Sequence, residues 1–129
     1  MTETTDKDAA RMAALQALPF LRDATPEEVA NGQKGRIFWT CPQPSGNWQA
    51  DCDQGEAWAR LLLDYMAEYR TFCLLGWVVR DMRHEPKLSG QAVGFLAIFA
   101  QLARFASMLA TGKAEALLAE AKEAKGEAA

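Results

Sequence analysis

The sequence has little of the material from which most catalytic and cofactor sites are built. Its 129 residues include a single histidine and three cysteines, and no glycine cluster follows a predicted strand. The missing glycine cluster excludes a phosphate-binding loop, because such a loop needs glycines to bring its backbone amides against the phosphates. We therefore expect no bound cofactor.

The three cysteines, Cys41, Cys52 and Cys73, are odd in number and widely spaced. This pattern is not typical of a disulfide-stapled secreted domain. A zinc site made of these cysteines and His84 is disfavoured, because structural zinc sites normally pair ligands two to four residues apart. The alternatives left are a disulfide between Cys41 and Cys52, or inert thiols that behave as small hydrophobic side chains.

The chain also lacks an excess of positive charge. Its net charge is −3, and residues 31–90 carry equal numbers of acidic and basic side chains. General nucleic-acid binding is therefore disfavoured, because gripping a phosphate backbone requires many cations. The acidic N-terminal segment has no continuous apolar core and does not resemble a secretion signal, so we expect a cytoplasmic protein.

No group of residues predicts catalysis. Asp51, Asp53 and Glu56 resemble the opening of a calcium loop, but the glycine is misplaced and no bidentate glutamate closes the loop. Their spacing fits the cap of a helix instead. His84, the one histidine available as a base, lies in a charged helix end, and Asp81 is expected opposite an apolar stripe. An enzyme is thus the less favoured interpretation.

The N-terminal third predicts two helices and a hairpin. Residues 6–18 have helical spacing, and "TPEEVANG" at 25–32 combines a capping box with an Asn-Gly exit, which predicts a helix of one to two turns. The β-branched and aromatic stretch 36–41 is matched by 47–52 across a turn rich in proline, so a β-hairpin is expected there.

Three core helices follow. A helix capped by Asp53 carries one broad apolar stripe from Trp58 to Tyr69. Residues 72–83 fit a helix or a buried strand, and we favour a helix. Ser89 caps a helix over 90–110 that is expected to be central and buried. A membrane-spanning helix is the less favoured alternative there, because Arg104 lies near the middle of its apolar run.

These patterns predict a mainly α fold with minor β content, namely a helical domain with a small β-hairpin near residues 36–52. We expect one domain over 1–129, with an N-terminal helix and linker at 1–24 and a tail rich in alanine, glutamate and lysine at 112–129, frayed at its end. The small residues Gly90 and Gly94 allow close approach of another helix, so a homodimer is one hypothesis.

The leading functional hypothesis is a non-enzymatic protein-binding module of the general character of bacterial or phage accessory proteins and inhibitors. Tryptophan is enriched at binding hot spots. The predicted partner-binding residues are Trp39, Trp48, Arg80, Arg83, His84 and Lys87. The rival hypothesis is a small enzyme or ligand carrier with a pocket lined by Trp39, Trp58 and Tyr65. A third is a DNA-associated regulator that uses the basic helix end.

Overall fold

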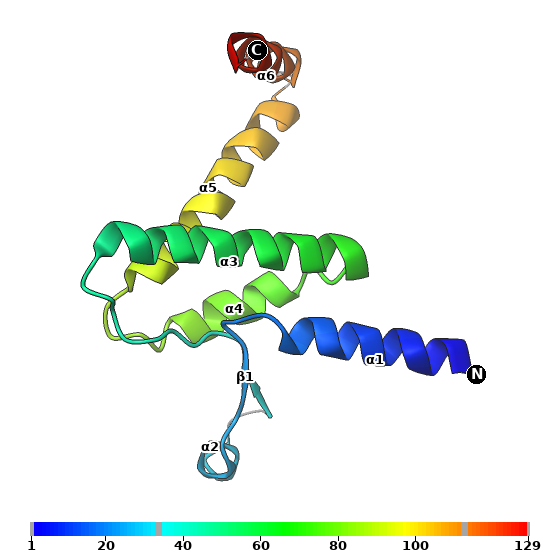
Figure 1. Cartoon of the computed structure of the whole chain (residues 1–129), viewed down its shortest axis with the longest axis vertical. Coiled ribbons are helices and arrows are strands. Elements are labelled where there is room, and N and C mark those ends of the chain that lie inside the picture. Colours follow the sequence, from blue (N-terminus) through cyan, green and yellow to red (C-terminus); the bar gives the residue numbers. More distant parts are fainter. Residues whose placement is uncertain (1, 33–34, 112–113, 129) are drawn as a thin grey trace.

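The computed structural model describes residues 2–32, 35–111 and 114–128, and it confirms the expected class: mainly α with a minor antiparallel β-hairpin (Figure 1). The elements are α1 (Thr2–Gln16), β1 (Arg22–Asp23), α2 (Pro26–Ala30), β2 (Arg36–Ile37), α3 (Trp48–Tyr69), α4 (Leu74–Met82), α5 (Gly90–Ala110) and α6 (Ala114–Ala128). Residues 72–83 are thus mainly helical. Of the expected tail 112–129, residues 114–128 form α6, and 112, 113 and 129 lie outside the described residues.

The small helix α2 begins and ends as its sequence predicts. The Thr25 side chain accepts a hydrogen bond from the Glu28 amide at 3.2 Å, and the Glu28 carboxylate accepts one from the Thr25 amide at 3.0 Å. Gly32 follows with a φ of +89°. Arg22 lies 2.7 Å from the Glu28 carboxylate, and this guanidinium is the main reason that the pKa of Glu28 is lowered to about 2.

The hairpin is present, but the expected partner strand at 47–52 was wrong. β2 pairs antiparallel with β1, with Arg22 opposite Ile37 and Asp23 opposite Arg36. Residues 48–52 form the start of α3 instead, and the Asn47 side chain caps this helix by accepting from the Ala50 amide at 3.1 Å. The expected cap at Asp53 is therefore wrong as well. Residues 51, 55, 58 and 62 are all buried at intervals of three and four, so the helical period of α3 already holds at residue 51. This period explains why the helix begins before residue 53.

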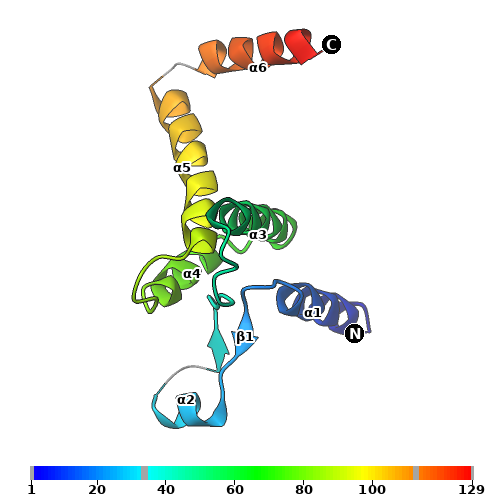
Figure 2. The ribbon, with the colours of Figure 1, turned by 60° about the vertical axis from the view of Figure 1, so that its left-hand side comes forward.

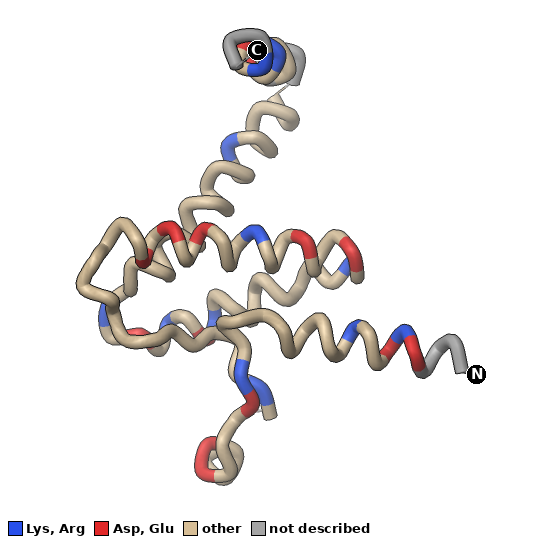
Figure 3. The backbone as a smooth tube through the Cα atoms, in the orientation of Figure 1, with Lys and Arg blue, Asp and Glu red and all other residues tan. Residues whose placement is uncertain are grey.

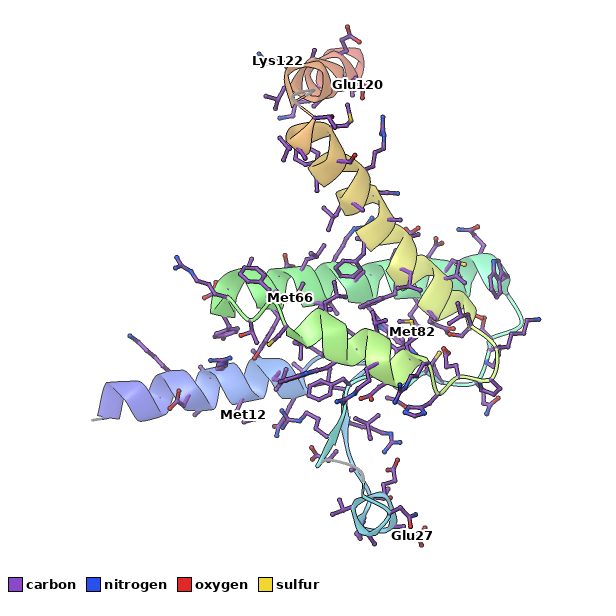
Figure 4. All side chains as sticks on the ribbon, turned by 180° about the vertical axis from the view of Figure 1, so that it is seen from behind. Met12, Glu27, Met66, Met82, Glu120 and Lys122 are labelled. Carbon is purple, nitrogen blue, oxygen red and sulfur yellow. The ribbon has the colours of Figure 1, made fainter. Side chains whose placement is uncertain are left out.

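The hydrophobic core is built around a cluster of four aromatic rings. Phe20, Trp39, Trp58 and Phe95 come from four separate segments, and their ring centroids lie 5.1–6.1 Å apart in the contacting pairs. Tilted and edge-on arrangements of this kind are the favourable ones for aromatic pairs. Leucine, valine and methionine side chains complete the core between α3 and α4, including Met66 and Met82, which Figure 4 labels.

Helices α3 and α5 cross in close contact, and three glycines make this contact geometrically feasible. A Cβ atom added at Gly94 would overlap the carbonyl oxygen of Cys52, and one added at Gly55 would overlap that of Gln91. At Gly90, an added Cβ would lie 2.7 Å from the Cβ of Asp51. The expected close approach at Gly90 and Gly94 is therefore confirmed, and α3 is the helix that approaches them.

The expectation that the whole 90–110 helix is buried was wrong for its second half. Phe95 is fully buried, whereas Leu102, Phe105 and Leu109 are 43%, 45% and 51% exposed. Beyond the crossing with α3, α5 extends away from the body of the molecule and carries α6 at its far end (Figures 1 and 2). By length and composition alone, α5 is long and apolar enough to cross a membrane, with a mean hydropathy of 1.7.

Candidate functional site

A cleft of about 690 Å³ lies between two loops, and four of the predicted partner-binding residues line it. One wall is the extended segment 39–44 together with Trp48 at the start of α3. The other wall is the connection 84–90 between α4 and α5. Of the predicted set, the cleft brings together Trp39, Trp48, His84 and Lys87. We refer to it as the tryptophan cleft.

The first wall is fixed to the body of the protein by backbone hydrogen bonds. The Thr40 amide donates to the carbonyl of Phe20, and the Phe38 amide donates to the Asp81 carboxylate, each at 2.8 Å. Asp81 is buried and also accepts from Arg80 at 3.0 Å. The expectation that Asp81 lies opposite the apolar stripe was therefore wrong: with Leu74, Val78 and Met82 it shares the buried face of α4.

A polar network joins the two walls at the base of the cleft. The indole of Trp39 and the hydroxyl of Ser89 both donate to one carboxylate oxygen of Glu85, at 3.3 Å and 3.2 Å. The thiol of Cys41 lies 3.5 Å from the same Ser89 hydroxyl. Because Ser89 also caps α5 by accepting from the Ala92 amide, the network ties the cleft to the helix that crosses α3.

The thiol of Cys41 in this network has a raised pKa. Burial is the largest cause that raises the pKa of Cys41, and the nearby carboxylates of Glu85 and Asp51 add to the effect. A nucleophilic cysteine needs the opposite, an electropositive setting that lowers its pKa. Cys41, Cys52 and Cys73 are all free thiols, so the alternative of a disulfide between Cys41 and Cys52 does not hold in this structure.

Trp48 and Trp39 differ sharply in exposure. Trp39 is 4% exposed and belongs to the aromatic core, whereas Trp48 is 56% exposed at the rim of the cleft. The loop before Trp48 is held in shape, because the buried carboxylate of Asp51 accepts from the Ser45 amide at 3.3 Å. Trp48 therefore presents a large apolar surface from a fixed position, which is the usual setting of a binding hot spot.

The predicted basic residues divide between the cleft and a neighbouring hollow of about 280 Å³. Arg80, Arg83 and His84 line the hollow. Arg36 from β2 also lines it, and this residue was not among the predicted contact residues. Arg80 is already bound to Asp81, whereas Arg83 and Lys87 have no carboxylate within 4.0 Å among the residues described. The acidic side chains Asp51, Asp81 and Glu85 each accept at least one hydrogen bond from within the protein. Figure 3 shows blue and red segments alternating from the end of α4 into its connection to α5, whereas the segment 39–47 is tan throughout.

The pocket expected from Trp39, Trp58 and Tyr65 does not form as predicted. All three side chains are buried in the core, and the rings of Trp39 and Trp58 contact one another edge-on with centroids 5.8 Å apart. The ranges 2–32, 35–111 and 114–128 hold no group of three or more histidine, cysteine or acidic side chains placed to bind a metal ion.

Sequence reasoning missed a second exposed aromatic group. Trp77 on α4 is 44% exposed, and its ring lies 5.1 Å from that of Phe38, beside Arg36 and Arg80. The helical spacing of Leu74, Val78 and Met82 was the available signal, because it places Trp77 on the far side of α4.

No protein-family model matches the chain, and no curated protein or solved structure is significantly similar to it. The geometry of the cleft and of its surroundings is therefore the basis for inferring a function.

Proposed function

We propose that the protein is a non-enzymatic protein-binding module that holds a segment of its partner in the tryptophan cleft. The observation that carries the proposal is the position of Trp48, a half-exposed tryptophan that lines the cleft of about 690 Å³. A tryptophan in this setting offers a large contact area at a low cost in conformational entropy. Binding of this kind would suit an accessory protein or an inhibitor.

We propose a partner segment that is apolar with an acidic flank, which two basic side chains at the cleft and the adjoining hollow would contact. The carboxylates of Asp51, Asp81 and Glu85 accept hydrogen bonds from the protein itself, and Asp81 is also paired with Arg80. Lys87 in the cleft and Arg83 in the adjoining hollow have no carboxylate within 4.0 Å among the described residues, and we assign the contact with an acidic flank to these two cations. Complementary charge of this sort mainly governs specificity and the association rate.

The test is a selection of peptides from a random library displayed on yeast, followed by affinity measurements on the recovered peptides. We expect peptides with an apolar or aromatic residue beside acidic residues. Trp48→Ala should weaken their binding by about 30-fold, or about 2 kcal/mol, the cost typical of a hot-spot tryptophan. Trp77→Ala is the matched control, because Trp77 is also about half exposed but lies on α4 outside the cleft. If the selected peptides bound the Trp48→Ala variant as tightly as the Trp77→Ala variant, the proposal would be refuted.

The alternative is a small-ligand carrier, which the cavity volume of about 690 Å³ favours because it lies within the range of ligand pockets. Native mass spectrometry of the purified protein separates the two. A stoichiometric adduct of defined mass would support the carrier. A bare chain, together with selected peptides whose binding depends on Trp48, would support the binding module.

A further inference from the structure

We infer that the outer half of α5, residues 99–110, binds the same segment of a second copy of this chain. One apolar stripe runs along α5 through Phe95, Ile98, Leu102, Phe105 and Leu109, at intervals of three and four residues. Its first two members are buried in the core, and its last three are 43–51% exposed. The surface lies away from the tryptophan cleft, and the inference is independent of the proposed function.

The spacing of the stripe indicates what kind of surface would cover it. Alternating steps of three and four give a mean period of about 3.5 residues, which is the period that keeps a seam facing another helix in a coiled coil. The outer stripe, comprising Leu102, Phe105 and Leu109, continues a surface that α5 already uses in the core. A helix with the same stripe is therefore a fitting partner.

The charges beside the stripe also favour a second copy. The positions that flank the seam hold Phe99, Gln101, Ala106 and Met108, all of them uncharged. Arg104, the single charged residue of α5, lies off the seam and 3.9 Å from Glu120 on α6 (Figure 3). Two copies would thus meet without repulsion between like charges, whereas a charged partner would find no complementary group on these flanks.

A membrane fits the outer half less well than a second helix does. Twelve residues of helix span about 18 Å, well short of the roughly 30 Å of a bilayer core. Using the whole of α5 to cross a bilayer would require its inner half to leave α3. The overlap that a Cβ at Gly94 would make with Cys52 shows how closely that inner half is packed. Figure 4 shows the side chains of the outer half projecting outward without a neighbouring element below α6.

The experiment is sedimentation equilibrium of the full chain from low to high micromolar concentration. We expect a monomer–dimer equilibrium. Leu102→Glu/Phe105→Glu should weaken it by at least about tenfold, because the interface would bury unpaired charge. The matched control is Ala100→Glu/Ser107→Glu, which adds the same charge to exposed positions on the opposite face of the same helix half.

Four results would overturn the inference: a wild-type chain that stays monomeric, a dimer that survives the seam substitution, a control that dissociates equally, or a monomer that instead cosediments with phosphatidylcholine–phosphatidylglycerol vesicles. Circular dichroism checks that the variants are folded. Hydrogen exchange of the wild-type chain at low and high concentration needs no variant. Slower exchange over 99–110 at high concentration supports the dimer, and exchange that does not depend on concentration contradicts it.

Discussion

The tryptophan cleft and the outer half of α5 both expose large apolar side chains, but they differ in shape and in charge. The cleft is concave, Lys87 lines it together with Trp48, and Arg83 lines the adjoining hollow. The outer half of α5 is a projecting helix with uncharged flanks around Leu102, Phe105 and Leu109. Exposed apolar area alone therefore does not identify a partner. The charged side chains around the area narrow the choice of partner.

The largest expected effect contrasts two phenylalanines on the same stripe of α5. Phe95→Ala removes a fully buried ring and should cost about 3–5 kcal/mol of unfolding free energy. Phe105→Ala, at a site 45% exposed, should cost within about 0.5 kcal/mol in dilute monomer. Urea unfolding at low protein concentration measures both. Similar losses for the two variants would mean that the outer half belongs to the core and would remove the contrast.

A second prediction concerns the contact that joins α5 to α3. Gly94→Ala places a Cβ against the backbone of Cys52, which has little room to move, and should destabilise the domain by about 3 kcal/mol. Gly76→Ala in α4 is the control, because its Cβ meets open space and alanine favours a helix over glycine by about 0.5–1 kcal/mol. Thermal unfolding should therefore shift in opposite directions, and a tolerated Gly94→Ala would contradict the close crossing.

A third prediction separates the two surfaces by charge. Lys87→Glu at the cleft should weaken selected acidic peptides by about fivefold, or about 1 kcal/mol, and leave dimerisation unchanged. Arg104→Glu on α5, away from the cleft, should leave peptide affinity unchanged. Isothermal titration calorimetry at two salt concentrations checks this. Peptide binding that responds equally to both reversals would show a long-range effect of net charge, not a local contact.

Much of the fold could be predicted from sequence because the signals were local. The capping box of α2, the Ser89 cap of α5 and the helical spacing of α4 each depend on neighbouring residues. The partner strand of β2 could not be predicted, since β1 is two residues long and lay within the expected linker 1–24. A short strand has too few side chains to show a period, so the longer stretch 47–52 was the better match on propensity alone.

Only part of the candidate site could be predicted from the sequence. Trp39, Trp48, His84 and Lys87 were predicted as contact residues, but their convergence on one cleft depends on how the loops 39–47 and 83–89 pass each other. The burial of Asp81 was hidden because a charged residue at a helical core position is usually assigned to the surface. It becomes stable there by accepting the Phe38 amide and the Arg80 guanidinium.

The smallest expected effect lies away from both surfaces, at α2. The folded-state pKa of Glu28, about 2, is below its ordinary value, so its stabilising contribution is present above the ordinary value and is lost as the pH falls toward 2. Glu28→Gln should remove this part of the acid dependence and change neither peptide binding nor dimerisation. Titration by NMR measures the pKa directly. An ordinary pKa for Glu28 would mean that the Arg22 contact does not persist in solution.

We propose that the partner segment binds in the tryptophan cleft, and not at Trp77 on α4 or on the outer half of α5, which we assign to a second copy of the chain. Hydrogen–deuterium exchange with and without a selected peptide tests it most directly, because it reports the location of binding along the chain. We predict slower exchange over 40–48 and 84–90, the two walls of the cleft, with 72–79 and 99–110 unchanged. Protection confined to 72–79 or 99–110, with the cleft walls unaffected, would contradict the claim.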